Sequence, residues 1–168
     1  DGSFSTNFMS NNNILASPKA DINIEGLWDY STGDPELIVA VIDSGMNLTH
    51  EDLAGRFWTN EDEIEGNNID DDGNGYIDDV NGWDFMNNDN DPTDDHGHGT
   101  NVGSIALATG NNSIGIAGVN WNSKIMVLKS LDENNSGSYS AMIESIYYAV
   151  DNGAKVINFS IGGSGYSE

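Results

Sequence analysis

Residues 37–45, LIVAVIDSG, form an uninterrupted apolar run that ends in the polar pair Asp43 and Ser44. The run does not alternate between apolar and polar residues, which is typical of a strand covered on both faces of a parallel sheet. Functional side chains in such sheets stand at the carboxyl ends of the strands. The run therefore predicts a buried strand that presents Asp43 at a functional edge.

The remaining chain alternates strand and helix patterns. Apolar runs predict strands at residues 125–128 and 156–160, and helical spacing predicts one helix over residues 98–109 and another that ends at Gly153. This alternation predicts an α/β domain with a mostly parallel sheet. The expected buried stripes of the two helices are Val102, Ile105 and Ala106, and Ile143, Ile146, Tyr147 and Val150.

The N-terminal region differs in composition. Residues 1–20 are rich in Ser and Asn and predict an extended arm, which leaves residues 21–168 for the domain. A short amphipathic helix is expected around Leu27, closed by Gly33.

Composition limits the possible functions. A formal net charge of −23 argues against binding of nucleic acid or of an anionic membrane. No apolar stretch reaches the roughly 20 residues that span a bilayer. The chain begins at Asp1 without a signal-peptide pattern and contains no Cys. We therefore expect a mature or trimmed product, compatible with a secreted protein stabilised by metal instead of disulfides.

Two polar residues at predicted element ends suit acyl-transfer chemistry. Such chemistry needs a base that is neutral near pH 7 and an anion that orients it. His98, at the first turn of a predicted helix, suits the base, and Asp43 suits the anion. Taken alone, Asp43 is better explained as a turn residue and His98 as a surface residue. Zinc binding by His96 and His98 is disfavoured because a third soft ligand is lacking.

The residues around this pair carry a family resemblance. Residues 37–45 resemble the catalytic-Asp strand of the subtilisin-like serine peptidases (subtilases), and residues 97–102, GHGTNV, resemble that family's catalytic-His segment. The resemblance covers about residues 20–165 and implies a three-layer subtilisin-like α/β fold with an Asp-His-Ser triad. Asn101 stands where the family usually has a second His, and residues 103–104 replace Ala-Gly with Gly-Ser, which remains small.

The same resemblance implies two substrate-binding edges. Residues 135–138, NSGS, resemble the family's extended segment that pairs with substrate backbone, as in strand addition. Residues 160–163, SIGG, resemble the opposite wall of the pocket. The implied substrate-binding residues are Ser136, Gly137, Ser160, Ile161 and Gly162.

An acidic region predicts a calcium site. Residues 60–95 hold 14 of the 28 acidic residues and no Lys or Arg. Within this region the spacing of residues 70–78 fits an EF-hand-type loop, and Asn81 in place of the final Glu leaves Asp79 or a water to complete the shell. The alternative is a solvated acidic loop. The expected ligands are Asp70, Asp72, Asn74, the Tyr76 carbonyl and Asp78.

Two further calcium sites are implied by the resemblance alone. Asp84, Asp89, Asp91 and Thr93 fall on the positions of a site that precedes the catalytic His in the thermitase-like branch of the family. A second family site would take side-chain oxygens from Asp52 and Asn112 and carbonyls from Thr109, Ile114 and Ile116.

No Ser in the chain has the Gly-Thr-Ser context of the family's nucleophile. We therefore expect the N-terminal part of a domain truncated before its C-terminal portion, inert alone and completed by the C-terminal remainder of the same peptidase as a second chain. The expected protein is a secreted, bacterial, calcium-dependent endopeptidase that acts on peptide or protein substrates. The alternatives are a catalytically inactive calcium-binding scaffold or binding module, and a small calcium-loop adhesion module.

Overall fold

The chain divides into two compact units, Asp1–Thr32 and Gly33–Glu168. A computed structural model of the protein describes residues 22–163. The first unit contains the short helix α2 (Glu25–Trp28), which was expected from the sequence and buries none of its residues. The predicted arm of residues 1–20 lies outside the described residues.

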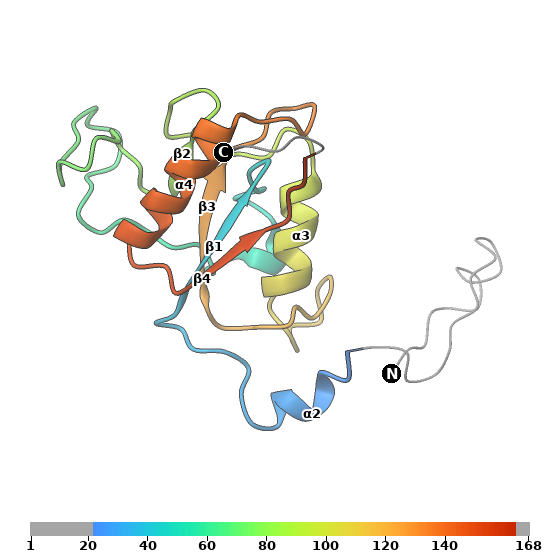
Figure 1. The fold of residues 1–168 in the computed structure, drawn as a ribbon. Coiled ribbons are helices and arrows are strands. Elements are labelled where there is room, and N and C mark those ends of the chain that lie inside the picture. The colour runs from blue at the N-terminus through green and yellow to red at the C-terminus, as the bar shows by residue number, and fades with distance from the viewer. Residues whose placement is uncertain (1–21, 164–168) are drawn as a thin grey trace. The chain divides into compact units, whose positions relative to one another are not determined.

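The second unit is an α/β fold built on a four-stranded parallel sheet with the strand order β2-β3-β1-β4. This arrangement confirms the predicted fold class, and Figure 1 shows β1 inside the sheet between β3 and β4. The elements of this unit are, in chain order, β1 (Ile38–Asp43), the 3-10 turn η1 (Glu51–Leu53), β2 (Gly82–Asp84), α3 (His98–Leu107), β3 (Lys124–Lys129), α4 (Tyr139–Asp151) and β4 (Val156–Phe159).

Strand β1 is apolar throughout because both of its faces are covered. Alternate side chains of a strand point to opposite faces of the sheet. Val41 accordingly joins the core cluster that contains Leu107 of α3, whereas Ile42 joins the cluster that contains Tyr148 of α4. The two helices lie on opposite sides of the sheet (Figure 1), which gives the three layers that the sequence led us to expect.

Strand β2 was not predicted. It lies within the acidic region and has only three residues, all buried. A Cβ added at Gly82 would lie 1.9 Å from the carbonyl oxygen of Val127 in β3, so only glycine permits this pairing. A short strand that begins with a backbone contact of this kind carries no apolar run that could reveal it.

Helix α3 confirms the helix expected over residues 98–109, but of its predicted apolar stripe only Ala106 packs against the core cluster that contains Leu107. Ile105 is 63% exposed, and Val102 and Ala106 are only half-buried. The small face of the helix lies against the sheet because glycine lets the helix approach closely. The residues that α3 buries are Gly99, Gly103, Ser104 and Leu107.

Helix α4 repeats this pattern. Its N-cap is Ser138, whose side chain accepts a hydrogen bond from the Ala141 backbone N–H, and Gly153 follows its end in a left-handed conformation. Its predicted stripe is wrong, since Ile143, Ile146, Tyr147 and Val150 are exposed in the described part of the chain. It buries instead a face with two alanines, which packs close to the sheet: Ala141, Ser145, Tyr148 and Ala149. No helix within residues 22–163 is both long and apolar enough to cross a membrane.

Candidate active site

Asp43 ends the central strand and is fully buried. Its backbone carbonyl accepts hydrogen bonds from the N–H groups of Ser130 and Leu131, which follow β3, so its position is tied to two strands. Its Oδ1 accepts a hydrogen bond of 2.7 Å from the Ser44 N–H. The carboxylate is thereby held at the carboxyl edge of the sheet, as the sequence led us to expect.

His98 is the first residue of α3, and its Nδ1 lies 2.7 Å from Oδ1 of Asp43. A carboxylate can only accept, so Nδ1 carries the proton and Nε2 is the basic nitrogen of the neutral ring. The His98 side chain is 34% exposed, whereas Asp43 is buried. The pair therefore combines a buried anion with an imidazole that other molecules can reach.

Two glycines beside His98 play different parts. Gly97 adopts φ of 97°, a left-handed conformation that favours glycine and begins the helix. Gly99 allows close approach, because a Cβ there would lie 2.1 Å from the Gly45 carbonyl oxygen. The backbone of α3 therefore touches the turn that follows β1.

A further carboxylate, which the sequence did not single out, holds this region together. Asp94 accepts hydrogen bonds from residues on both sides of His98 and from the Ser44 hydroxyl. Burial alone would raise the pKa of Asp94, but hydrogen bonds from Thr100, Gly97 and Ser44 outweigh it and hold that pKa below its ordinary value. In the sequence Asp94 is one of many acidic residues before His98, and no local pattern distinguishes it.

The two predicted substrate-binding edges lie on one cavity of about 400 Å³. Ser136 and Gly137 line one part of it, and Ile161 and Gly162 line another. Ser160 does not line it and instead bonds through Oγ with the side chain of Asn158. The apolar part of the wall comes from Leu131, Tyr139, Met142 and Phe159.

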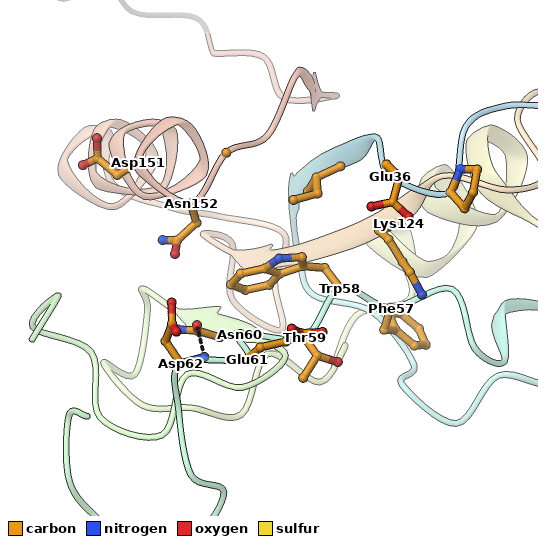
Figure 2. Close-up of a pocket in the computed structure, with 13 residues that line it drawn as sticks. Glu36, Phe57, Trp58, Thr59, Asn60, Glu61, Asp62, Lys124, Asp151 and Asn152 are labelled. Atoms are coloured by element: carbon orange, nitrogen blue, oxygen red, sulfur yellow. Dashed lines mark hydrogen bonds between the residues drawn. The ribbon is translucent and has the colours of Figure 1, made fainter. Parts of the chain in front are cut away.

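A second cavity, of about 600 Å³, lies at the opposite end of the sheet, where β1 begins and α4 ends. Figure 2 shows the Trp58 side chain lying across it, with Asn152 on one side and Thr59 on the other. Four exposed carboxylates surround it, while Lys124 on its wall donates to the Gly55 carbonyl oxygen at 3.3 Å. None of the predicted site residues lines this cavity, so it is separate from the candidate active site. The four carboxylates are those of Glu36, Glu61, Asp62 and Asp151.

The acidic region brings together a set of carboxylates that differs from the predicted one. Within residues 22–163, Glu63, Asp72 and Asp79 form a group whose oxygens lie within 4.8 Å of one another. The Asp70 carboxylate instead accepts from the N–H groups of Asn74 and Gly75. Glu63 was not predicted as a ligand, because it lies outside the EF-hand-type spacing.

The other residues of the predicted loop are placed as follows. Both oxygens of Asp78 are turned to the backbone N–H groups of Asn67 and Asn68. Asn74 donates through Nδ2 to Asp72 and Asp79, so its amide lies beside the group. Tyr76 packs its ring against that of Trp83, with 5.1 Å between the ring centroids.

The residues of the family-implied calcium site at Asp52 lie together around that residue, which is buried. Oδ1 of Asp52 accepts from the Asn112 side chain at 2.7 Å, and Oδ2 accepts from the Ile116 N–H at 2.8 Å. The Thr109 N–H donates to the Asp52 carbonyl oxygen, and the Ile114 N–H donates to Oδ1 of Asn112. The loop that follows α3 is therefore folded onto this one carboxylate.

The residues of the calcium site implied at Asp84 run from that residue, the last of β2, into one tight loop. Asp84 and Asp89 exchange two backbone hydrogen bonds, Asp91 donates its N–H to the side chain of Asp89, and Thr93 donates to that of Asp91. Burial raises the pKa of Asp84, against hydrogen bonds from the backbone of Asn87 and its neighbour. The four residues share a loop, while their carboxylates accept bonds from the loop itself.

The sequence profile of the subtilase family matches residues 34–168. The chain is 43% identical over 130 residues to subtilisin-like protease 1 of Plasmodium berghei, which covers 77% of the chain and 22% of that protein. It is 39% identical over 135 residues to thermophilic serine proteinase of Bacillus sp. (strain AK1), covering 80% and 28%.

It is also 38% identical over 137 residues to thermitase of Thermoactinomyces vulgaris, covering 82% of the chain and 41% of thermitase. The chain thus spans between about a fifth and two fifths of the length of these relatives.

Proposed function

This chain belongs to the subtilase family, and from that premise we propose that it carries the aspartate and histidine of the catalytic triad of a serine-type endopeptidase. The observation that carries the proposal is the 2.7 Å contact between Nδ1 of His98 and Oδ1 of Asp43. These two residues lie 55 positions apart in the sequence and meet at the carboxyl edge of a parallel sheet, where α/β proteins place their sites.

In the proposed reaction His98 is the general base and Asp43 orients it. Nε2 takes the proton from a serine hydroxyl as its oxygen attacks the peptide carbonyl carbon. The buried carboxylate of Asp43 keeps the proton on Nδ1 and stabilises the imidazolium that forms. His98 then returns the proton to the leaving amine, and water hydrolyses the acyl-enzyme by the same steps.

The nucleophile in this proposal is a serine outside residues 1–168. His98 is held by its hydrogen bond to Asp43 in the described part of the chain. The relatives extend well beyond the region that this chain matches, so they have room for a further catalytic residue. We propose that the C-terminal remainder of the same peptidase provides this serine and packs on the exposed apolar face of α4. That face, with Ile146 and Val150 among its residues, supports such a partner.

The proposed substrate is a peptide bound as an added strand. The residues 136–137 and 161–162 lie on the walls of one cavity, and the apolar side chains between them offer a place for an apolar residue of the substrate. The names of the relatives, which include a serine proteinase, support a peptide or protein substrate.

Calcium is the proposed cofactor. Carboxylate and carbonyl oxygens are the ligands that this cation prefers, and the oxygens of Glu63, Asp72 and Asp79 already converge within 4.8 Å. Asp70 and Asp78 do not belong to this converging group, which is why we assign the ion to Glu63, Asp72 and Asp79. The loops around Asp52 and Asp84 are two further proposed calcium sites. Bound calcium would neutralise the converging carboxylates and thereby stabilise the fold.

We further propose that the peptidase is secreted. The relatives come from Plasmodium as well as from bacteria, so the resemblance does not indicate a bacterial source.

A fluorophosphonate probe tests the proposal in the peptidase that contains this chain. We expect the wild type to be labelled, and Asp43→Asn and His98→Ala to lower turnover by roughly ten-thousandfold or more. Asp62→Asn, an exposed carboxylate remote from the pair, is the matched control and should retain activity. A wild type that is not labelled would favour the inactive calcium-binding scaffold, and full activity of His98→Ala would contradict the assigned base.

A further inference from the structure

Asp94 lies four residues before His98, and its carboxylate is the acceptor at the centre of a hydrogen-bond network. Oδ1 and Oδ2 both take part, so neither oxygen is left without a partner. The five donors are Ser44 Oγ at 2.8 Å, His96 N at 3.1 Å, Gly97 N at 2.8 Å, Thr100 N at 2.9 Å and Thr100 Oγ1 at 2.5 Å.

These donors surround the catalytic pair. Ser44 directly follows Asp43 in the chain, and its hydroxyl also accepts a 2.9 Å bond from the Gly99 N–H. Gly97 and Thr100 stand on either side of His98. The carboxylate of Asp94 and the hydroxyl of Ser44 therefore connect the end of β1 with the first turn of α3.

We propose that Asp94 is a positioning residue that sets the distance between Asp43 and His98. This inference rests on the proposed function, because it assigns Asp94 a role in that same site. Asp94 acts through the backbone on either side of His98 and through Ser44, and it touches neither the substrate nor the reacting atoms.

The first N–H groups of a helix have no partner within the helix, and a carboxylate that accepts from them fixes where the helix begins. A helix cap alone, however, would not connect Asp94 with the end of β1. The bond from Ser44 Oγ makes this connection, since Ser44 N also donates to Oδ1 of Asp43.

Two variants separate positioning from simple capping. Asp94→Asn keeps one acceptor oxygen but places an amide where the other oxygen accepts, so Ser44, which donates to Oδ1, and Thr100, which donates to Oδ2, can no longer both be held. Ser44→Ala leaves the carboxylate and its contacts with Gly97 and Thr100 in place, and removes the connection to β1 together with the bond that Ser44 Oγ accepts from the Gly99 N–H. Asp62→Asn removes an equal charge far from the site and is the control.

The first measurement is the NMR signal of the His98 Nδ1 proton in the full peptidase, which reports on the bond to Asp43 whether or not the enzyme turns over. We expect this signal to shift and broaden in Asp94→Asn and in Ser44→Ala, and to stay unchanged in Asp62→Asn. Unchanged signals in both site variants would overturn the proposal and leave Asp94 as a helix cap.

The second measurement is the split between kcat and KM with a peptide substrate. Displacement of a base by a fraction of an ångström lowers turnover without loss of substrate contacts, so kcat should fall about 10- to 100-fold in Asp94→Asn and about fivefold in Ser44→Ala, with KM nearly constant. A fall in melting temperature with unchanged kcat would overturn it. If the wild type is not labelled by the fluorophosphonate, the proposed function fails, while the proton signal still decides the role of Asp94.

Discussion

A Cβ built on Gly99 would lie 2.1 Å from the carbonyl oxygen of Gly45 and 3.1 Å from Cβ of Asp43. The first turn of α3 and the turn after β1 are therefore in direct backbone contact. No side chain fits at position 99 unless one of these two segments moves.

This contact predicts different costs for two similar substitutions. Gly99→Ala must displace backbone, so we expect it to lower the free energy of unfolding by about 3 kcal/mol and to weaken the contact between His98 and Asp43. Gly103→Ala meets Cε and Sδ of Met46, the end of a flexible side chain, and should cost about 1 kcal/mol or less. Urea denaturation of both variants measures the difference, and equal costs would contradict the close approach at Gly99.

We expect the buried guanidinium of Arg56 to contribute strongly to the free energy of unfolding. The guanidinium donates to the carbonyl oxygens of Ser123, Leu107 and Asn120, and burial lowers the pKa of Arg56 to about 10, so the group stays charged at neutral pH. Arg56→Gln leaves these carbonyls without donors and should destabilise the protein by about 2–4 kcal/mol. Lys155→Gln, at an exposed position, is the matched control and should change the urea midpoint little.

Tyr148 predicts a loss of stability at high pH. Burial, together with its hydrogen bond to Asp79, raises the pKa of Tyr148 above its ordinary value. The unfolded chain ionises this phenol near pH 10 whereas the folded protein does not, so the unfolded state binds fewer protons above that pH. Its contribution is therefore complete below about pH 10 and is lost at about 1.4 kcal/mol per pH unit above it.

Two matched variants isolate this tyrosine. In Tyr148→Phe the free energy of unfolding should fall less steeply between about pH 10 and 12, while exposed Tyr147→Phe should keep the wild-type slope. Chemical denaturation at several alkaline pH values gives the slopes. Identical slopes in Tyr148→Phe and wild type would contradict the raised pKa.

The acidic group predicts a calcium-dependent melting temperature. An ion held by Glu63, Asp72 and Asp79 would stabilise the folded protein by about 4 kcal/mol at a thousandfold excess over its dissociation constant. Asp72→Asn should reduce the difference in melting temperature between calcium and EDTA, and Asp62→Asn should not. If calcium and EDTA give the same melting curve for the wild type, the cofactor proposal fails. If Asp72→Asn keeps the full difference, calcium binds elsewhere.

In the second unit β1, β3, β4, α3 and α4 could be predicted because their signals are local, whereas β2 could not. The apolar run before Asp43 indicates a strand with two covered faces. Ser138 marks the start of α4 as its N-cap, and Gly153 marks its end with a left-handed conformation. The meeting of Asp43 with His98 was also expected, from the resemblance of their two segments to the catalytic segments of the subtilases. The roles assigned to these two residues stay predictions.

The buried faces of α3 and α4 could not be predicted, because these helices bury mainly small residues and expose several large apolar ones. Ile105 is large and apolar and yet exposed, whereas Gly103 is buried against Met46. Periodicity counts apolar residues but does not reveal where a helix must come close to a sheet. The hydrogen bonds of the acidic region could not be predicted either, since spacing does not reveal that Asp78 accepts from the N–H groups of residues 67 and 68.

The order of strands in the sheet has a consequence for synthesis. Among the strands of the described residues β1 is made first, but its neighbours β3 and β4 begin only at Lys124 and Val156. While the nascent chain leaves the ribosome, both edges of this apolar strand stay open until late, and contacts between such distant segments form slowly. An open apolar edge pairs readily with other strands. We therefore expect the yield of correctly folded protein to depend on how well this one strand is shielded during translation.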